Sequence, residues 1–97
     1  MVERIMLFKL HDSTKRDQLA QRAVDALSTI DDIEELSVGV PADAASEKSW
    51  DLSVVLGVTN LALLDTVLEG ARFTAWVDGV MNEHTNVLKA WTFDRLT

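Results

Sequence analysis

The chain has 97 residues, 47% hydrophobic and 26% charged, which is the composition of one globular domain over 1–97 and excludes a disordered segment. Nine basic and 16 acidic residues give a net charge of −7, which opposes nucleic acid and anionic membranes as partners. There is no cysteine, no secretion signal and no apolar run of membrane-spanning length, so we expect a cytoplasmic protein without disulfides.

The first predicted element is a strand over Val2–Leu10 that is apolar on both faces. Side chains alternate along a strand, so Met6 and Phe8 lie on one face, and Ile5 and Leu7 on the other. A strand of this kind is typical of the centre of a sheet that is covered on both sides.

A helix and an edge strand are predicted next. Thr14 and Asp17 resemble a capping box, and apolar residues at helical spacing continue to about Ser28. Alternation over Ile33–Val40 predicts a half-exposed edge strand, and the small, polar stretch Ala42–Ser49 is predicted to be a mobile loop.

The second half of the chain contains two further strands around two helical segments. Trp50–Thr59 predicts a strand with Trp50 on its apolar face. Helices are predicted at Leu61–Glu69, with Asn60 as its N-cap, and from about Arg72 to His84, and Val87–Arg95 predicts the closing strand.

The order β-α-β-β-α-β predicts an α+β, ferredoxin-like fold. In this fold a four-stranded antiparallel sheet carries its helices on one face, because both crossovers are right-handed.

The opposite face of the sheet would then be apolar and uncovered. Its predicted members are Ile5, Leu7, Val55, Trp91 and Phe93. A contiguous apolar patch of this size usually marks an interface, so we expect a homodimer through the sheet face, forming a dimeric alpha/beta barrel. The alternative is a one-residue slip in one strand, which would scatter these residues.

Four segments carry a family resemblance: Val2–Leu10, Leu36–Gly39, Trp50–Val55 and Leu88–Asp94. Together they resemble the stress-responsive dimeric alpha/beta-barrel (Dabb) domain family, through loose apolar patterns over nearly the whole chain. The resemblance implies a ferredoxin-like homodimer, stress-associated and of unassigned biochemical role. Relatives in that family include plant stress proteins and a polyketide cyclase.

The acid and base groups of the cyclase branch are missing from this sequence. By resemblance its first-strand histidine falls at Arg4, its His-Pro-Ala-His stretch at Gly70–Phe73, and its tyrosine at about Val67. A cyclase of that mechanism is therefore not expected. A different cofactor-independent enzyme, of cyclase or monooxygenase type and acting on an aromatic or polyketide-like substrate, stays open as an alternative.

A candidate ligand pocket lies between the sheet and the helices. Its predicted members are Arg4, Met6, Phe8, Val54, Val67, Phe73, Trp76 and His84. The same residues also fit a filled core. The alternative is a cavity between sheet and helices that binds a small apolar or aromatic ligand. Arg4 either reaches water or binds an anion at the pocket mouth.

The two histidines, His11 and His84, are too few and too far apart to indicate a metal site. His84 lies near the C-terminal end of a predicted helix, and a structural role there accounts for it without proton transfer. We predict no metal and no cofactor, and the sequence leaves open whether the protein is an enzyme.

Overall fold

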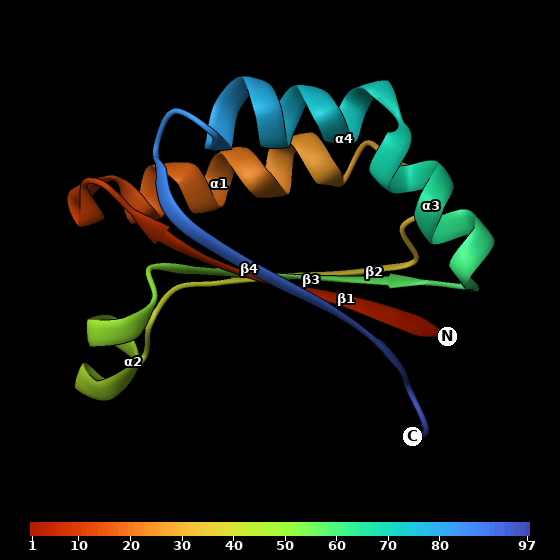
Figure 1. The fold of residues 1–97 in the computed structure, drawn as a ribbon, viewed down its shortest axis with the longest axis horizontal. Helices are drawn as coiled ribbons and strands as arrows, with labels where there is room; N and C mark the ends of the chain where they lie inside the picture. Colours follow the sequence, from red (N-terminus) through yellow and green to blue (C-terminus); the bar gives the residue numbers. More distant parts are fainter.

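The computed structural model describes residues 1–97 and shows a four-stranded antiparallel sheet with a helical layer on one face (Figure 1). The strands are β1 (Val2–Leu10), β2 (Glu35–Gly39), β3 (Leu52–Val58) and β4 (Thr85–Asp94). The helices are α1 (Arg16–Leu27), α2 (Ala44–Ser49), α3 (Leu61–Glu69) and α4 (Ala71–Trp76), with a 3-10 turn η1 (Ser13–Lys15) and a π-helical turn η2 (Val77–Met81). We call the face under α1, α3 and α4 the inner face and the opposite face the outer face.

The strand order β2-β3-β1-β4, with every pair antiparallel, confirms the predicted ferredoxin-like fold. β1 occupies the centre, as its two-sided apolar pattern indicated. β2 and β4 are the edges, and the only proline, Pro41, lies just beyond β2, where a missing N–H costs no ladder bond.

The core fills the space between the inner face and the helices. Phe8 on β1 meets Trp76 edge-on at a ring-centroid distance of 5.7 Å, and Phe73 meets the same Trp76 at 5.6 Å. Edge-to-face pairs of this kind contribute about 0.5–1.5 kcal/mol each beyond burial of their area. The Phe8–Trp76 pair therefore holds α4 on the central strand β1, while Phe73 packs on the indole from within α4 itself.

Two of the predicted helix boundaries are wrong. Asp12 caps the 3-10 turn, accepting a hydrogen bond from the Thr14 N–H at 3.0 Å, and α1 begins at Arg16 without a side-chain cap. The capping box of Thr14 and Asp17 is therefore absent. The helix expected to run to His84 ends as the π-helical turn η2.

The stretch predicted as a mobile loop forms the short helix α2, which lies on the outer side of the sheet (Figure 1). Its N-cap is Asp43, whose carboxylate accepts a hydrogen bond from the Ser46 N–H at 2.7 Å. Lys9 holds the helix to β1 by donating to the Glu47 carbonyl at 3.4 Å. A helix of six residues is too short to repeat an apolar stripe, so periodicity could not reveal it.

Candidate functional site

The outer face consists of three rows of side chains that cross all four strands. Register places one row at Glu35, Gly57, Glu3 and Phe93, the next at Ser37, Val55, Ile5 and Trp91, and the third at Gly39, Ser53, Leu7 and Lys89. The five residues predicted from the sequence for a dimer interface therefore share one face of the sheet.

Large apolar side chains on this face are open to solvent. Trp91 is 45% exposed and Phe93 is 54% exposed, while Ile5, Leu7 and Val55 are half-buried. The apolar side chains that β1 and β3 place on the inner face are almost completely buried, Phe8 at 0%. Nothing within one chain covers the outer aromatics.

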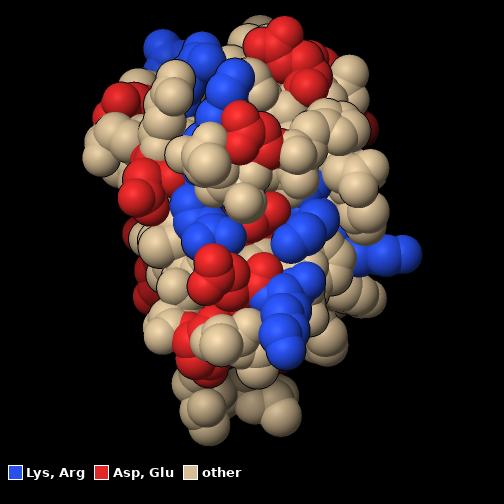
Figure 2. Space-filling model, turned by 90° about the vertical axis from the view of Figure 1, so that its left-hand side faces the viewer, with Lys and Arg blue, Asp and Glu red and all other residues tan.

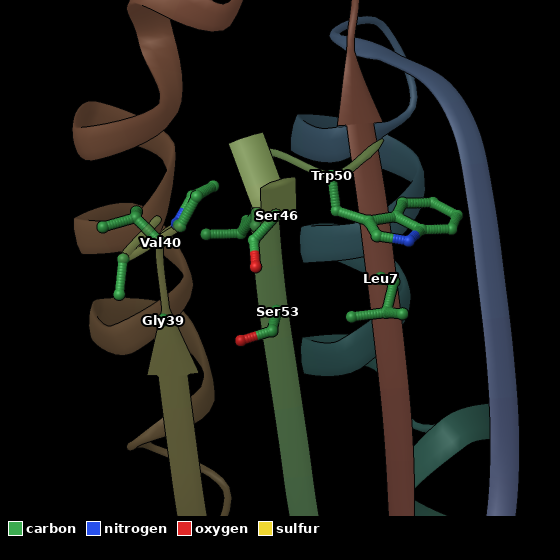
Figure 3. Close-up of a pocket in the computed structure, with 9 residues that line it drawn as sticks. Leu7, Gly39, Val40, Ser46, Trp50 and Ser53 are labelled. Carbon is green, nitrogen blue, oxygen red and sulfur yellow. The ribbon is translucent and has the colours of Figure 1, made fainter. Parts of the chain in front are cut away.

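A hollow of about 250 Å³ opens on the outer face beside α2 (Figure 3). Its lining residues are Leu7, Gly39, Val40, Pro41, Ala42, Ser46, Trp50, Leu52 and Ser53. The Trp50 ring lies beside Leu7, so the prediction that Trp50 joins the inner apolar face is wrong. β3 begins only at Leu52, and the alternation that the prediction used does not extend back to Trp50.

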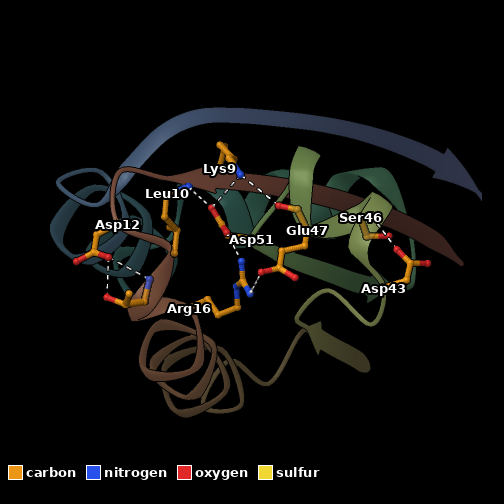
Figure 4. A network of polar contacts seen from close by, with 9 residues as sticks. Lys9, Leu10, Asp12, Arg16, Asp43, Ser46, Glu47 and Asp51 are labelled. Carbon is orange, nitrogen blue, oxygen red and sulfur yellow. Dashed lines mark hydrogen bonds and ion pairs between the residues drawn. The ribbon is translucent and has the colours of Figure 1, made fainter.

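Asp51 is the one buried charged residue, with no exposed surface. Its carboxylate accepts hydrogen bonds from the Leu10 N–H at 2.9 Å and from Arg16 Nη2 at 2.7 Å, and Lys9 Nζ lies 3.7 Å away (Figure 4). Arg16 also reaches Glu47 on α2 at 3.5 Å. The group ties β1, α1 and α2 together where the β1–β3 ladder ends.

Burial raises the pKa of Asp51, but the hydrogen bonds from Arg16 and Leu10 and the charge of Lys9 outweigh it. The pKa of Asp51 therefore lies below its ordinary value, and the side chain is a carboxylate at neutral pH. Figure 2 shows basic and acidic side chains side by side on the surface at this end of the molecule.

A second ion-pair cluster closes the other end of the outer face. Arg95, just beyond β4, donates to Glu3 on β1 at 3.0 Å and to Glu35 on β2. Both hydrogen bonds raise the pKa of Arg95, and the bond to Glu35 has the larger effect. Arg95 in turn lowers the pKa of Glu35. The apolar centre of the outer face is thus bounded by charged groups at both ends.

Six residues of the ligand pocket predicted from the sequence lie together in the core. They are Met6, Phe8, Val54, Val67, Phe73 and Trp76, each at most 6% exposed. The indole Nε1 of Trp76 is buried without a hydrogen-bond partner. These side chains contact one another, and the openings of the surface lie at their periphery.

Arg4 and His84, the two polar members of the predicted pocket, lie outside every surface opening. Arg4 Nη1 donates to Thr92 Oγ1 on the neighbouring strand at 3.0 Å, and its Nε is buried without a partner. His84 follows η2, where its carbonyl accepts from the His11 N–H at 2.9 Å and its Nε2 lies 3.1 Å from Glu83.

A cavity of about 270 Å³ opens between η2 and the start of β4, on the helix side of the sheet. Phe8, Val77, Met81 and Leu88 form its apolar part, and Asp78, Asn82, Thr85 and Asn86 its polar part. Asp78 is the single charged residue of the lining. Single π-helical turns that interrupt or end α-helices occur frequently at functional sites.

Sequence reasoning missed the Asp51 group, the hollow and the polar side of this cavity. An aspartate directly before the apolar run of β3 was a visible signal for a buried carboxylate, because such a residue needs a cation. The hollow left no such signal, since it depends on register and on α2.

Comparison with solved structures supports the fold. A Dabb family protein with a ferredoxin-like fold from Mesorhizobium loti has a TM-score of 0.82 at 11% identity, over 99% of this chain and 97% of that one. A dimeric ferredoxin-like protein of unknown function from Thermobifida fusca has a TM-score of 0.82 at 14% identity, over 97% and 90%. Hydroxynitrile lyase from Passiflora edulis has a TM-score of 0.78 at 12% identity, over 99% and 94%.

No family model matches the chain, and no curated protein matches its sequence. No three acidic or histidine side chains converge to hold a metal ion. None of the helices has both the length and the apolar content that a bilayer crossing requires.

Proposed function

We propose that the protein works as a homodimer that closes its outer sheet face against a second copy, as a barrel-like assembly of the stress-responsive alpha/beta-barrel type. The observation that carries this proposal is the exposure of Trp91 and Phe93 on the outer face, where Trp91 shares a row with Ile5 and Val55. Burial of a large apolar side chain contributes roughly 1.5–3 kcal/mol, and a twofold interface counts each one twice. The Thermobifida fusca protein of the same fold is described as dimeric, which supports the proposal.

Trp91→Asp tests the dimer, because it places an unpaired charge in the centre of the proposed interface. We expect sedimentation to show a dissociation constant raised on the order of a hundredfold or more. Leu61→Asp is the matched control, since Leu61 is 58% exposed but lies on α3, away from the outer face. A Trp91→Asp protein that remains a dimer of unchanged affinity would contradict the proposal.

A second candidate function, within the same dimer, is binding of a small, mainly apolar ligand in the cavity beside η2. An apolar cavity of about 150 Å³ can hold benzene, so a space of about 270 Å³ has room for a bicyclic aromatic. Four polar side chains at one side could fix its orientation. With Asp78 as the only charge in the lining, the cavity favours neutral or cationic ligands over carboxylates.

Three indoles of similar shape test this binding by calorimetry: indole, tryptamine and indole-3-acetate. We expect the amine to bind most tightly and the carboxylate least, and Asp78→Asn to remove the advantage of the amine over indole. Asp65→Asn, on the exposed side of α3, should leave all three affinities unchanged. If wild type binds none of the three, the ligand proposal is wrong, and the dimer proposal is untouched.

A further inference from the structure

The outer face has two unequal halves, and most side chains are smaller on β2 and β3 than on β1 and β4. On β1 and β4 the three rows hold Glu3 with Phe93, Ile5 with Trp91, and Leu7 with Lys89. On β2 and β3 the same rows hold four glycines and serines, Ser37, Gly39, Ser53 and Gly57, besides Val55 and the ion-paired Glu35. We call these the bulky half and the small half.

The small half contains the hollow, and its shape depends on two small residues that face each other. A Cβ added to Gly39 would lie 2.9 Å from Ser53 Oγ, so no larger residue fits at Gly39 without a shift. The space of about 250 Å³ has an indole wall, Trp50, and an apolar floor that includes Leu7. It has room for an aromatic side chain, because a cavity of about 150 Å³ already holds benzene.

We propose that β4 of each protomer packs its aromatic residues over the small half of its partner, with Trp91 filling the hollow beside the partner's α2. This inference rests on the proposed homodimer and specifies its geometry. In a twofold interface each protomer gives and receives the same contact, so one operation fills both hollows. The other twofold arrangement, β4 upon β4, would set bulky half against bulky half and leave both hollows empty, with their walls lacking contacts.

Charge favours the same arrangement. Lys89 lies on the outer face in the row next to that of Trp91, and it forms no ion pair within its own chain. The hollow is walled by α2, whose capping residue Asp43 also lacks a cation partner. β4 over the small half brings Lys89 of each protomer toward the acidic start of the partner's α2.

A double-mutant cycle on the dissociation constant tests this geometry. Ser53→Phe fills the hollow from its own chain, and Trp91→Ala removes the proposed occupant. We expect each single change to weaken the dimer about tenfold or more, and the double variant to be no weaker than Trp91→Ala alone. Effects that multiply independently would overturn the arrangement, while a monomeric wild type would instead overturn the dimer itself.

Lys89→Cys gives a second test, which leaves the hollow unchanged and so does not depend on the folding of the Ser53 and Trp91 variants. Lys89 is exposed and the chain has no cysteine of its own, so the new thiol is the only one in each protomer. Under mild oxidation we expect the dimer of this variant to form no disulfide between its two protomers. β4 upon β4 would bring the two thiols close to each other, so rapid formation of a covalent dimer through this single thiol would overturn the proposal.

Discussion

The two faces of the sheet are built from the same strands but differ in how far their apolar side chains are buried within one chain. On the inner face, Phe8 and its neighbours are buried by α1, α3 and α4 of the same chain. On the outer face, Trp91 and Phe93 have no layer above them. A strand that is apolar on both sides needs two covering layers, and this chain encodes only one of them.

The difference separates two kinds of stability. Side chains of the inner face stabilise the folded chain at any concentration, because their partners belong to the same molecule. Side chains of the outer face can stabilise the protein only when a second copy supplies partners, so their contribution depends on concentration.

Phe8→Ala and Phe93→Ala form a matched pair across the sheet. Phe8 is 0% exposed and Phe93 is 54% exposed. We expect Phe8→Ala to lower the free energy of unfolding by about 3–5 kcal/mol, measured with urea at a dilution where the protein is monomeric. At the same dilution Phe93→Ala should change the unfolding free energy little, while it weakens the dimer at higher concentration. Equal losses in the dilute monomer would contradict the distinction between the faces.

Asp51→Asn addresses the boundary between the two faces. The amide can still accept from the Leu10 N–H, but it loses the charge that faces Arg16 and Lys9. Charged hydrogen bonds contribute about 1.5–3 kcal/mol, so we expect a loss of that order in chemical unfolding. Glu47→Gln, an exposed partner of the same Arg16, is the control and should change stability little. An Asn variant as stable as wild type would show that the group is not a structural tie.

The fold was predictable because its signals are local and periodic. Alternation along four strands predicted the sheet, and the register brings Ile5, Val55 and Trp91 into one row, as the alternation implied. The helix predictions failed where the local pattern is weakest. The short helix α2 was predicted as a loop, and the last predicted helix ends in η2, where the spacing departs from 3.6 residues per turn.

The sites could not be read in the same way because their parts are distant in sequence. Asp51 lies 41 residues from Leu10 and 35 from Arg16, and neither separation has a sequence signature. The decrease in side-chain size across the outer face becomes visible only after β2 has been placed beside β3 and β4 beside β1. Predicting such a gradient requires the register first, and periodicity gives only the face.

Lys89→Glu tests the charge contact across the proposed dimer. We expect it to weaken the dimer several-fold at low salt, because it places like charge near Asp43 and Glu47 of α2 in the partner, and this effect should fade as salt increases. Arg22→Glu, at an exposed position of α1 on the helix side of the sheet, is the control for total charge. A salt-independent loss for Lys89→Glu would point to packing and contradict the proposed charge contact.

The smallest expected effect is the pH dependence that Asp51 confers. Its pKa in the folded protein lies below the ordinary value, so its ionised form stabilises the fold above about pH 4, where an unfolded aspartate is also ionised. That contribution is lost as pH falls through the lower folded pKa. We therefore expect the gap in unfolding free energy between wild type and Asp51→Asn to be constant near neutral pH and to narrow below about pH 4. Other carboxylates with lowered pKa values, such as Asp12 and Asp43, are present in both proteins and cancel in the difference. Urea unfolding of the dilute monomer from pH 7 to pH 3 measures the gap. A gap that stays constant throughout would mean that Asp51 supports the end of β1 through shape and hydrogen bonding, with no contribution from its charge.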